Sequence, residues 1–447
     1  MNVLIIGAVA AGMSTASKLR RLDESIKITV LEKGKDVSYG ACGLPYFLSD
    51  MISDEQKLIA RTPEKFIEQG INLLLNHEAI EVNHEEKTVK AFNHETKEER
   101  IFSYDKLVIA TGTSPIRLPV EGKNLKGIHT LNSLEDGRRL KAALNKPDVK
   151  KVAVVGAGYI GLEVAENLIE MGKEVIIIEK ENRVLTKFSE LVSKITLETL
   201  LSHDISVNLN ETVMAYHGKD HVTHVITDDA TYQVDLVIEA IGVIPNTKFL
   251  ENIPFERLSN GAIITNKRME TSVKDIYAAG DCVAYYHRIL KTTHSFLPLG
   301  THANKAGRVI AENIAGENSF FEGVIGSSVI KVFDLEIART GLDLKEAKAH
   351  HINAKSVHIT AKDRSSYYPN AKNIDIEIIY NDDTCQLLGA YMIGKSGVAH
   401  RINTIATAVS LGMTAEEYAA LDYAYAPPFS PVYDPVQIAT NQIKCKK

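Results

Sequence analysis

The stretch Gly156-Ala-Gly-Tyr-Ile-Gly161 decides the fold of this chain. It follows the apolar run Val152–Val155 and precedes a segment that carries apolar residues at helical spacing. In a glycine turn between a strand and a helix, the first glycine permits the tight turn, the second lets a pyrophosphate approach the backbone, and the third lets helix and strand pack closely. The stretch therefore predicts a dinucleotide site at a helix N-terminus, where free N–H groups and the helix dipole favour phosphate.

The same plan occurs at the start of the chain. Val3–Leu22 and Val152–Met171 each read as a strand, a glycine-rich turn and a helix, although Val9 replaces the middle glycine of the first turn, Gly7-Ala-Val-Ala-Ala-Gly12. Two Rossmann-like β-α-β units in one chain predict an α/β fold with two nucleotide sites. The larger residue in the first turn indicates a different pyrophosphate approach, which suits FAD as readily as NAD.

An acidic residue closes the second strand of each unit. Ile26–Leu31 is followed by Glu32, and Glu174–Ile178 is followed by Glu179. A carboxylate at this place can bind both ribose hydroxyls, whereas it would repel a 2′-phosphate. For the second unit we therefore expect NADH in preference to NADPH.

Three further strands end in small residues, and the first two mark crossings between domains. Lys106–Gly112 and Asp235–Gly242 are each followed within a few residues by a proline, and Asp275–Asp281 ends in an aspartate that could bind the ribityl hydroxyls of a flavin. From about residue 320 the pattern changes to alternating β-type runs, followed by helical stretches at 397–411 and 414–421. The tail therefore reads as an α+β domain.

Composition is that of an ordinary water-soluble protein of two or three domains. Of the 447 residues, 45% are hydrophobic and 24% charged, and the net charge of -6 gives no general attraction to nucleic acid or to an anionic membrane. No apolar run reaches the roughly 18 to 20 residues that span a bilayer. The first residues lack the basic start and cleavage site of a signal peptide, so we expect a cytoplasmic protein.

The four cysteines are too far apart in sequence to indicate a metal site or a set of disulfides. Cys42, Cys282, Cys385 and Cys445 form no CxxC pair, so neither a zinc centre nor a disulfide framework is expected. Three of them, all except Cys42, are interpreted as small buried hydrophobic residues. A reducing compartment fits this usage.

In their order along the chain, these motifs resemble those of the pyridine nucleotide-disulfide oxidoreductases. The resemblance covers essentially the whole sequence and rests on the two glycine turns, Glu32, Ala110-Thr111-Gly112, Glu179, Gly242 and Gly280-Asp281. It implies an FAD domain (1–115 and 246–318) interrupted by an NAD(P)H domain (116–245), with a C-terminal dimerisation domain (319–447). We therefore expect a homodimer whose partner chain completes the active site.

The resemblance also implies which residues contact each cofactor. The expected FAD contacts are Gly7, Ala8, Ala10, Ala11, Gly12, Glu32, Lys33, Ala110, Thr111, Gly112, Asp281 and Ala303. The expected NADH contacts are Gly156, Gly158, Tyr159, Ile160, Gly161, Glu179 and Gly242.

The sequence around Cys42 is similar to the single-cysteine branch of that family. Ser38-Tyr-Gly-Ala-Cys42-Gly-Leu-Pro-Tyr46 offers one cysteine where dithiol members carry two in a CxxxxC arrangement. A single thiol must alternate between thiolate and a mixed disulfide, or between thiolate and sulfenic acid. Pro45 is consistent with a helix start, which would stabilise the Cys42 thiolate.

Two departures help to choose within this branch. Oxidases and peroxidases of the group carry a histidine in the first glycine turn, whereas this chain has Ala10 and Ala11. The Cys42 flank and the segments around Tyr367 and Tyr425 look like coenzyme A-disulfide reductases, in which partner-chain tyrosines reach the cysteine. This resemblance implies that Tyr425 and Tyr367 help to protonate the leaving thiolate, although an interface tyrosine is more often a packing residue.

A cationic helix face could bind coenzyme A. Ser14, Lys18 and Arg21 are spaced four and three residues apart after the first glycine turn, and hence share one face. Cations there could hold the ADP phosphates while the pantetheine arm runs past Ser38 to Cys42. A solvated basic face explains the same pattern equally well. Arg61 and Lys65 are weaker candidates for phosphate contacts.

The expected function is therefore NADH- and FAD-dependent reduction of coenzyme A disulfide or persulfide through Cys42. Three alternatives stay open at this point. They are an NADH oxidase that reduces oxygen, a persulfide or polysulfide reductase, and a non-enzymatic flavin- or NADH-binding redox sensor.

Overall fold

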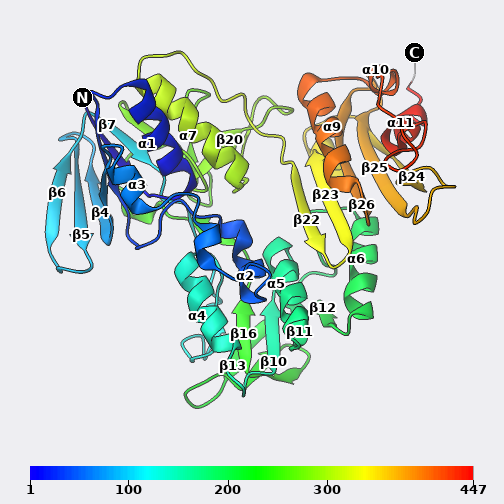
Figure 1. Cartoon of the computed structure of the whole chain (residues 1–447), viewed down its shortest axis with the longest axis horizontal. Helices are drawn as coiled ribbons and strands as arrows, with labels where there is room; N and C mark the ends of the chain where they lie inside the picture. Colours follow the sequence, from blue (N-terminus) through cyan, green and yellow to red (C-terminus); the bar gives the residue numbers. More distant parts are fainter. Residues whose placement is uncertain (446–447) are drawn as a thin grey trace.

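The computed structural model describes residues 1–445, and three five-stranded sheets organise it (Figure 1). The first sheet is parallel and has the order β19-β7-β1-β2-β3. Its strands are β1 (Asn2–Ile6), β2 (Lys27–Leu31), β3 (Asn72–Leu74), β7 (Lys106–Ile109) and β19 (Ile276–Ala278). Because β19 comes from the second half of the chain, this sheet is assembled from two separate segments.

The second sheet repeats the topology of the first. Its order is β12-β11-β10-β16-β9, so each sheet has the strand before its glycine turn at the centre. The strands are β9 (Ile128–His129), β10 (Lys151–Val155), β11 (Glu174–Glu179), β12 (Ser206–Leu209) and β16 (Leu236–Glu239). The internal repeat predicted from the sequence is confirmed at the level of strand order.

Two short strands join the first two sheets. β8 (Thr113–Pro115) leaves the first sheet and pairs antiparallel with β17 (Val243–Pro245), which leaves the second. Thr111 Oγ1 donates to Asn246 O at 2.8 Å, and Asn246 Nδ2 donates back to Thr111 O at 3.0 Å. The chain therefore enters and leaves the second unit side by side, at the two places where proline follows a buried strand.

Three small three-stranded sheets extend the two parallel units. Two of them are antiparallel: one comprises β4 (His77–Asn83), β5 (Thr88–Asn93) and β6 (Glu99–Ser103), and the other comprises β13 (Val213–His217), β14 (His224–Thr227) and β15 (Thr231–Gln233). The third is mixed and comprises β18 (Ile263–Ile264), β20 (Val283–Tyr286) and β21 (His294–Ser295), with β18 parallel and β21 antiparallel to β20.

The third large sheet is antiparallel and lies in the C-terminal part of the chain. Its order is β22-β23-β26-β25-β24. The strands are β22 (Ser328–Val332), β23 (Leu335–Gly341), β24 (Ala354–Lys362), β25 (Asn373–Asn381) and β26 (Leu387–Gly394). The central strand β26 is buried along its whole length, which explains its uninterrupted apolar sequence. The sequence prediction of an α+β tail is confirmed.

Helices cover these sheets and cap their own ends. The first-unit helices are α1 (Ala10–Leu22), α2 (Leu44–Leu48), α3 (Pro63–Ile67) and α7 (Gly300–Ile314); the second-unit helices are α4 (Leu134–Leu144), α5 (Tyr159–Glu170) and α6 (Glu190–Ser202); the C-terminal helices are α8 (Leu344–Ala349), α9 (Val398–Leu411), α10 (Ala415–Ala419) and α11 (Pro435–Asn441). Capping boxes at Ser133, Asp343, Thr414 and Asp434 satisfy free N–H groups at four of the starts.

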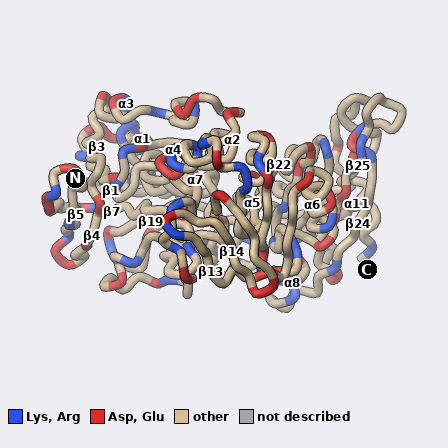
Figure 2. The backbone as a smooth tube through the Cα atoms, turned by 90° about the horizontal axis from the view of Figure 1, so that it is seen from below, with Lys and Arg blue, Asp and Glu red and all other residues tan. Residues whose placement is uncertain are grey.

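The interiors of the three bodies are apolar, and charge of both signs is spread over their surfaces. One apolar cluster fills the first unit, and the sheet and helices of the C-terminal part enclose another. In the view of Figure 2, basic and acidic residues alternate along the tube, without an extended face of one sign. Within residues 1–445, no helix combines the length and apolarity needed to cross a bilayer.

The expectation for two of the cysteines is wrong. Cys385, in the turn between β25 and β26, is disulfide-bonded to Cys445, after α11, with the two Cα atoms 5.7 Å apart. The sequence separation of 60 residues carries no spacing signal, which is why the pair was missed. Cys282 is buried and free, as expected, and Cys42 is exposed and free.

Candidate functional site

The first glycine turn is shaped by a strained backbone and one buried carboxylate. Gly7 has a φ of 103°, and a Cβ at this place would lie 2.2 Å from Ala110 O. The N–H of Ala8 donates to Glu32 Oε2 at 2.7 Å, and that of Gly34 donates to Oε1 at 2.9 Å. Burial raises the pKa of Glu32, although these two N–H groups oppose the shift. Glu32 thus organises the turn from the end of β2.

The second glycine turn has the same construction. Gly156 has a φ of 104°, and Glu179 Oε2 accepts from the N–H of Ala157 at 2.6 Å. Glu179 Oε1 accepts from the N–H of Glu181 at 3.0 Å. A Cβ added at Gly158 would meet nothing within 4 Å, so the chain leaves open space at the middle position. This space is the place where a close pyrophosphate requires a glycine.

Segments far apart in sequence meet beside the first turn. A Cβ on Gly280 would lie 3.2 Å from the Cβ of Ala11 and 4.0 Å from that of Ala303. Asp281 follows at once, and burial alone raises the pKa of its carboxyl. A buried carboxyl at the convergence of three segments suits the hydroxyls of a ligand that is not part of the chain. The structure therefore brings Ala11, Asp281 and Ala303 together, as the resemblance implied.

The remaining expected cofactor contacts differ in exposure. Lys33 and Ile160 are exposed, whereas Tyr159 is mostly covered and its hydroxyl lies 2.9 Å from Ser328 Oγ. The ring of Tyr159 also packs edge-on against Phe188. Tyr159 therefore links the second glycine turn to the C-terminal sheet.

Cys42 lies between the two nucleotide-binding units. It occupies a 3₁₀ turn, Ala41–Gly43, that runs directly into α2, and α2 packs on both α4 and α5. Arg138 of α4 holds the segments on both sides of Cys42, through Asp36 before it at 2.7 Å and Glu55 after it at 2.7 Å. The lone thiol is thus positioned by side chains from both units.

The protein's own groups do not stabilise the Cys42 thiolate. Although Cys42 is exposed on its outer side, the protein around it desolvates the thiolate and so raises the pKa of this thiol, and the negative charges of Glu163 and Asp281 raise it further. The turn supplies only one opposing backbone hydrogen bond. Pro45 is the second residue of the five-residue helix α2, but any stabilisation of the thiolate by this helix start is outweighed in the chain alone by desolvation and the two carboxylates.

Glu163 is the nearest acidic group that the sequence reasoning missed. It projects from α5, and burial together with Glu166 raises its pKa to about 7, against a hydrogen bond with Tyr46. Glu166 itself is tied to Lys331 and accepts from the N–H of Phe333 at 3.0 Å. The GxGxxG motif identifies the glycines of the turn but not this side chain. The sequence signal that could have found it is a glutamate two residues after the last glycine, Gly161.

A cavity of about 330 Å³ runs from the first glycine turn to the segment before Cys42. It is lined by Val9, Ala10, Met13, Ser14, Ser17, Arg21, Ser38, Tyr39, Gly40, Ala60, Arg61, Phe66, Asn304 and Arg308. Of the expected substrate contacts, Ser14, Arg21, Ser38 and Arg61 line it. Three arginines around one cavity favour an anionic ligand.

Lys18 and Lys65 do not line this cavity, whereas two residues of α7 do. Lys18 forms an ion pair with Glu312 at 3.1 Å. Asn304 accepts a hydrogen bond from Ser14 at 2.6 Å, and Arg308 adds the third guanidinium. The spacing of Asn304 and Arg308, four residues apart, could have indicated a common helix face, but nothing in sequence connects α7 with α1.

Tyr367 and Tyr425 lie together on the C-terminal part of the chain. Their hydroxyls are 3.1 Å apart, and both side chains are exposed. Hydrogen bonds from Tyr425 and Ser365 lower the pKa of Tyr367, whereas the bond to Tyr367 raises the pKa of Tyr425. Neither tyrosine lines the cavity beside Cys42 in the same chain.

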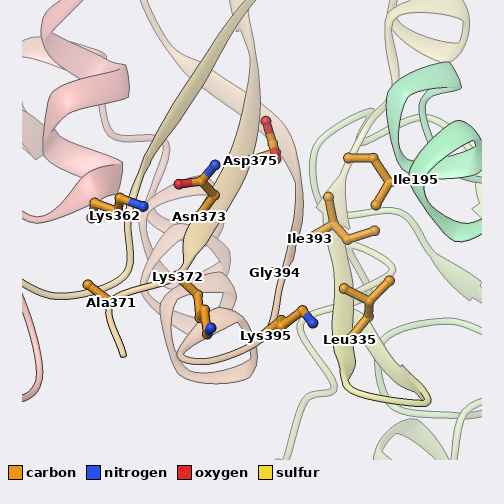
Figure 3. A pocket seen from close by; sticks show the side chains of 10 residues that line it. All are labelled: Ile195, Leu335, Lys362, Ala371, Lys372, Asn373, Asp375, Ile393, Gly394 and Lys395. Atoms are coloured by element: carbon orange, nitrogen blue, oxygen red, sulfur yellow. The ribbon is translucent and has the colours of Figure 1, made fainter. Parts of the chain in front are cut away.

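A second cavity, of about 430 Å³, lies between α6 and the end of the C-terminal sheet (Figure 3). Ile195, Leu335 and Ile393 form an apolar side, and Lys362, Lys372 and Lys395 stand around it. It contains neither a cysteine nor a glycine turn, so we place the candidate active site at the first cavity.

Two nucleotide-binding units that flank one exposed thiol define a dinucleotide-dependent thiol–disulfide oxidoreductase. A family model described as "Pyridine nucleotide-disulphide oxidoreductase" matches residues 1–300, and its dimerisation domain matches residues 327–435. The chain belongs to the pyridine nucleotide-disulphide oxidoreductase family.

Named relatives match over nearly the whole chain. The NAD(P)H sulfur oxidoreductase (CoA-dependent) of Pyrococcus abyssi is 38% identical over 99% of this chain and 98% of its own length. A coenzyme A disulfide reductase of Staphylococcus aureus is 33% identical over 96% of both chains. The solved water-forming NADH oxidase from Lactobacillus brevis, bound to NADH, is 27% identical, covers 99% of this chain and 98% of its own, and has a TM-score of 0.95.

Proposed function

We propose that this protein is an FAD-dependent NAD(P)H:disulfide oxidoreductase that reduces coenzyme A disulfide, or coenzyme A persulfide, at Cys42. The observation that carries the proposal is the position of the one exposed free thiol, directly after the arginine-lined cavity and between two nucleotide-binding units. The names of the Pyrococcus abyssi and Staphylococcus aureus relatives agree with this substrate class.

Binding follows from the charge of the cavity. Arg21, Arg61 and Arg308 would hold the phosphates of coenzyme A, because guanidinium groups bind phosphate oxygens in pairs. Ser38 would contact the pantetheine arm on its way to Cys42. Arg61 is already placed by Ser17 at 3.3 Å and by the face of Phe66, which leaves its guanidinium beside the cavity.

The chemistry at Cys42 is a disulfide exchange followed by reduction. The Cys42 thiolate attacks coenzyme A disulfide, one coenzyme A leaves as thiolate, and a mixed disulfide between Cys42 and coenzyme A remains. Bound FAD supplies two electrons that originate in NAD(P)H. Reduction of the mixed disulfide with one proton releases the second thiol and restores the thiolate.

We further propose a homodimer in which Tyr367 and Tyr425 of one chain face Cys42 of the other. The matched dimerisation domain includes both tyrosines, and their exposure leaves the hydroxyls free to reach another chain. Because the hydrogen bond with Tyr425 lowers the pKa of Tyr367, Tyr367 is the better proton donor to a leaving thiolate. A tyrosine with only a packing role would not change the pH profile when replaced by phenylalanine.

The cofactor contacts and domain limits complete the proposal. The residues expected from the sequence bind FAD in the first unit (1–115 and 246–318) and NADH in the second (116–245). The C-terminal unit (319–447) forms the dimer, although its last two residues lie outside the described part of the chain. Glu179 is the basis for preferring NADH over NADPH. The cytoplasm is the expected compartment.

Anaerobic turnover with NADH and coenzyme A disulfide tests the function. We expect the Cys42→Ser variant to lose about a thousandfold or more of kcat, since it lacks the nucleophile. The Cys282→Ala variant, which changes the other free cysteine, retains activity. Denaturation of substrate-treated wild type should release one coenzyme A per Cys42 on reduction. Absence of this adduct would contradict the proposal.

Measurement of oxygen consumption distinguishes the proposed disulfide reductase from the main alternative, an NADH oxidase. The relative from Lactobacillus brevis is an NADH oxidase, but this chain has Ala10 and Ala11 where the oxidases carry a histidine. We expect oxygen to be consumed more slowly than coenzyme A disulfide is reduced. Undiminished oxygen consumption in Cys42→Ser, without any coenzyme A adduct in wild type, would favour the oxidase instead.

A further inference from the structure

We propose that Cys385 and Cys445 form a second redox site, which low-molecular-weight disulfides such as coenzyme A disulfide oxidise and the corresponding thiols reduce. The proposal starts from a covalent fact: the two sulfurs are bonded, although the chain belongs to a family whose chemistry produces thiols. It does not require turnover at Cys42, so the two sites can be tested separately.

Both partners of the bond are accessible to small molecules. Cys385 and Cys445 are each only partly covered. Cys385 lies in the hairpin turn, with a φ of 59° and with its N–H bonded to Asn381 O at 2.8 Å. The N–H of Ala415 in turn bonds to Cys385 O at 2.9 Å. Cys385 is therefore fixed by its backbone whether or not the sulfur is bonded, whereas Cys445 follows the last helix.

Charge distinguishes the two sulfurs. The sequence around Cys445 is Lys444-Cys-Lys-Lys447, so three lysines flank it. Neighbouring cations favour the thiolate and attract anionic reactants such as the phosphates of coenzyme A. Cys385 instead follows Asp382, which pairs with Lys355 at 2.8 Å, and the exposed Asp383, so the remaining charge beside it is negative and does not favour a thiolate. Cys445 is therefore the attacking sulfur and Cys385 the resolving one.

The exchange balances without a further reactant. The Cys445 thiolate attacks coenzyme A disulfide, a Cys445–coenzyme A disulfide forms and one coenzyme A thiolate leaves. The Cys385 thiol loses its proton to solvent and attacks the Cys445 sulfur, and the second coenzyme A leaves as thiolate. Two protein thiols are oxidised, and one disulfide is reduced to two thiols.

The bond closes a segment that includes the proposed active-site tyrosine. Between the two cysteines lie α9, α10, Tyr425 and α11. Asp434, at the start of α11, accepts from Arg401 at 2.8 Å, and Arg401 donates to Asp363 O at 2.9 Å. Oxidation thus fastens the end of α11 to the hairpin, and reduction releases it.

Mass analysis of the holoenzyme in defined redox buffers tests this site. The Cys42→Ser variant, loaded with FAD, is incubated anaerobically at a series of ratios of coenzyme A disulfide to coenzyme A, then acid-quenched, alkylated and digested. We expect the Cys385–Cys445 peptide pair to change from alkylated to linked as the ratio rises. A bond that survives every thiol-rich buffer, or a dithiol that survives every disulfide-rich one, would overturn the proposal.

Single variants test the order of attack. In Cys385→Ser, Cys445 should retain one coenzyme A because the resolving thiol is missing. Lys444→Glu should slow the oxidation by coenzyme A disulfide severalfold, but not the oxidation by the cationic disulfide cystamine. Equal slowing by both disulfides would contradict the proposed role of charge. Activity at Cys42 is measured separately in Cys445→Ser, so a failure of one site does not obscure the other.

Discussion

The two glycine-turn units share a strand order and a hydrogen bond from the turn to a glutamate, but their helices present side chains of opposite charge to the site. In each unit a glutamate at the end of the second strand accepts from an N–H inside the glycine turn, at 2.7 Å for Glu32 and 2.6 Å for Glu179. The helix of the first unit directs Ser14 and Arg21 into a cavity, whereas that of the second directs Glu163 towards Cys42.

This difference shows which parts of the repeat serve the fold and which serve chemistry. The glycine turn and the glutamate that accepts from it are constrained by backbone contacts, so they are the same in both units. The helix faces are free to differ because their side chains point away from the sheet. One face places the guanidinium of Arg21 at the cavity, and the other provides a carboxylate, that of Glu163, whose pKa lies near neutrality.

The largest effect should come from adding a side chain at the last glycine of each turn, Gly12 in the first unit and Gly161 in the second. A Cβ at Gly12 would lie 1.9 Å from Gly7 O, and one at Gly161 would lie 2.0 Å from Gly156 O. We expect Gly12→Ala to destabilise its unit by about 3 kcal/mol or more and to lose FAD. Gly161→Ala should keep FAD but lose reduction by NADH. Flavin absorbance after gel filtration and the rate of flavin reduction distinguish the two, and a variant that loses both would show that the units do not fold separately.

The middle positions offer a sharper test, because the chain itself leaves Gly158 room for a side chain. We expect Gly158→Ala to raise the KM for NADH about tenfold, which corresponds to 1.4 kcal/mol, while the urea midpoint is unchanged. The matched change Val9→Gly in the first unit should leave FAD bound. An unchanged KM in Gly158→Ala would mean that no pyrophosphate approaches this turn.

The next comparison lies on α1 alone. We expect Arg21→Ala to raise the KM for coenzyme A disulfide about tenfold, as for the loss of a charge-assisted hydrogen bond. Lys18→Ala should change it less than about twofold, because Lys18 is paired with Glu312 outside the cavity. Steady-state kinetics with both variants decide the matter. An equal rise in KM in both variants would indicate that Lys18 also contacts the substrate.

The last comparison concerns pH and Glu163, the carboxylate that only the second unit has on its helix. Its folded pKa is about 7, above the ordinary 4.5, so the folded chain holds a proton that the unfolded chain has lost between these values. Stability should therefore fall by about 3 kcal/mol as pH rises through this range, and Glu163→Gln should remove that fall. Urea denaturation of the holoenzyme at a series of pH values measures it. Alkylation should also show a lower pKa for Cys42 in the variant.

Sequence reasoning predicted what depends on local pattern. Both glycine turns, their acidic residues and the α+β tail follow from strand and helix periodicity, and the structure has them where expected. Arg308 and the Cys385–Cys445 bond were missed because each depends on a tertiary contact between distant segments. Lys18 does not line the cavity, because its ammonium group pairs with Glu312 of α7, a contact that the spacing on α1 could not indicate. The raised pKa of Cys42 depends on Glu163 and Asp281, which only folding brings near it.

The pairing of β8 with β17 has a consequence for how such a protein can arise. Because the second unit begins and ends at two adjacent strands, a gene segment encoding it could be inserted into, or exchanged within, the first unit without separating the host's own strands. The host loop would close over almost no distance, so little conformational entropy opposes the insertion. Recombination can therefore exchange the second unit as a block and leave the arginine-lined cavity intact, because every residue that lines this cavity belongs to the first unit.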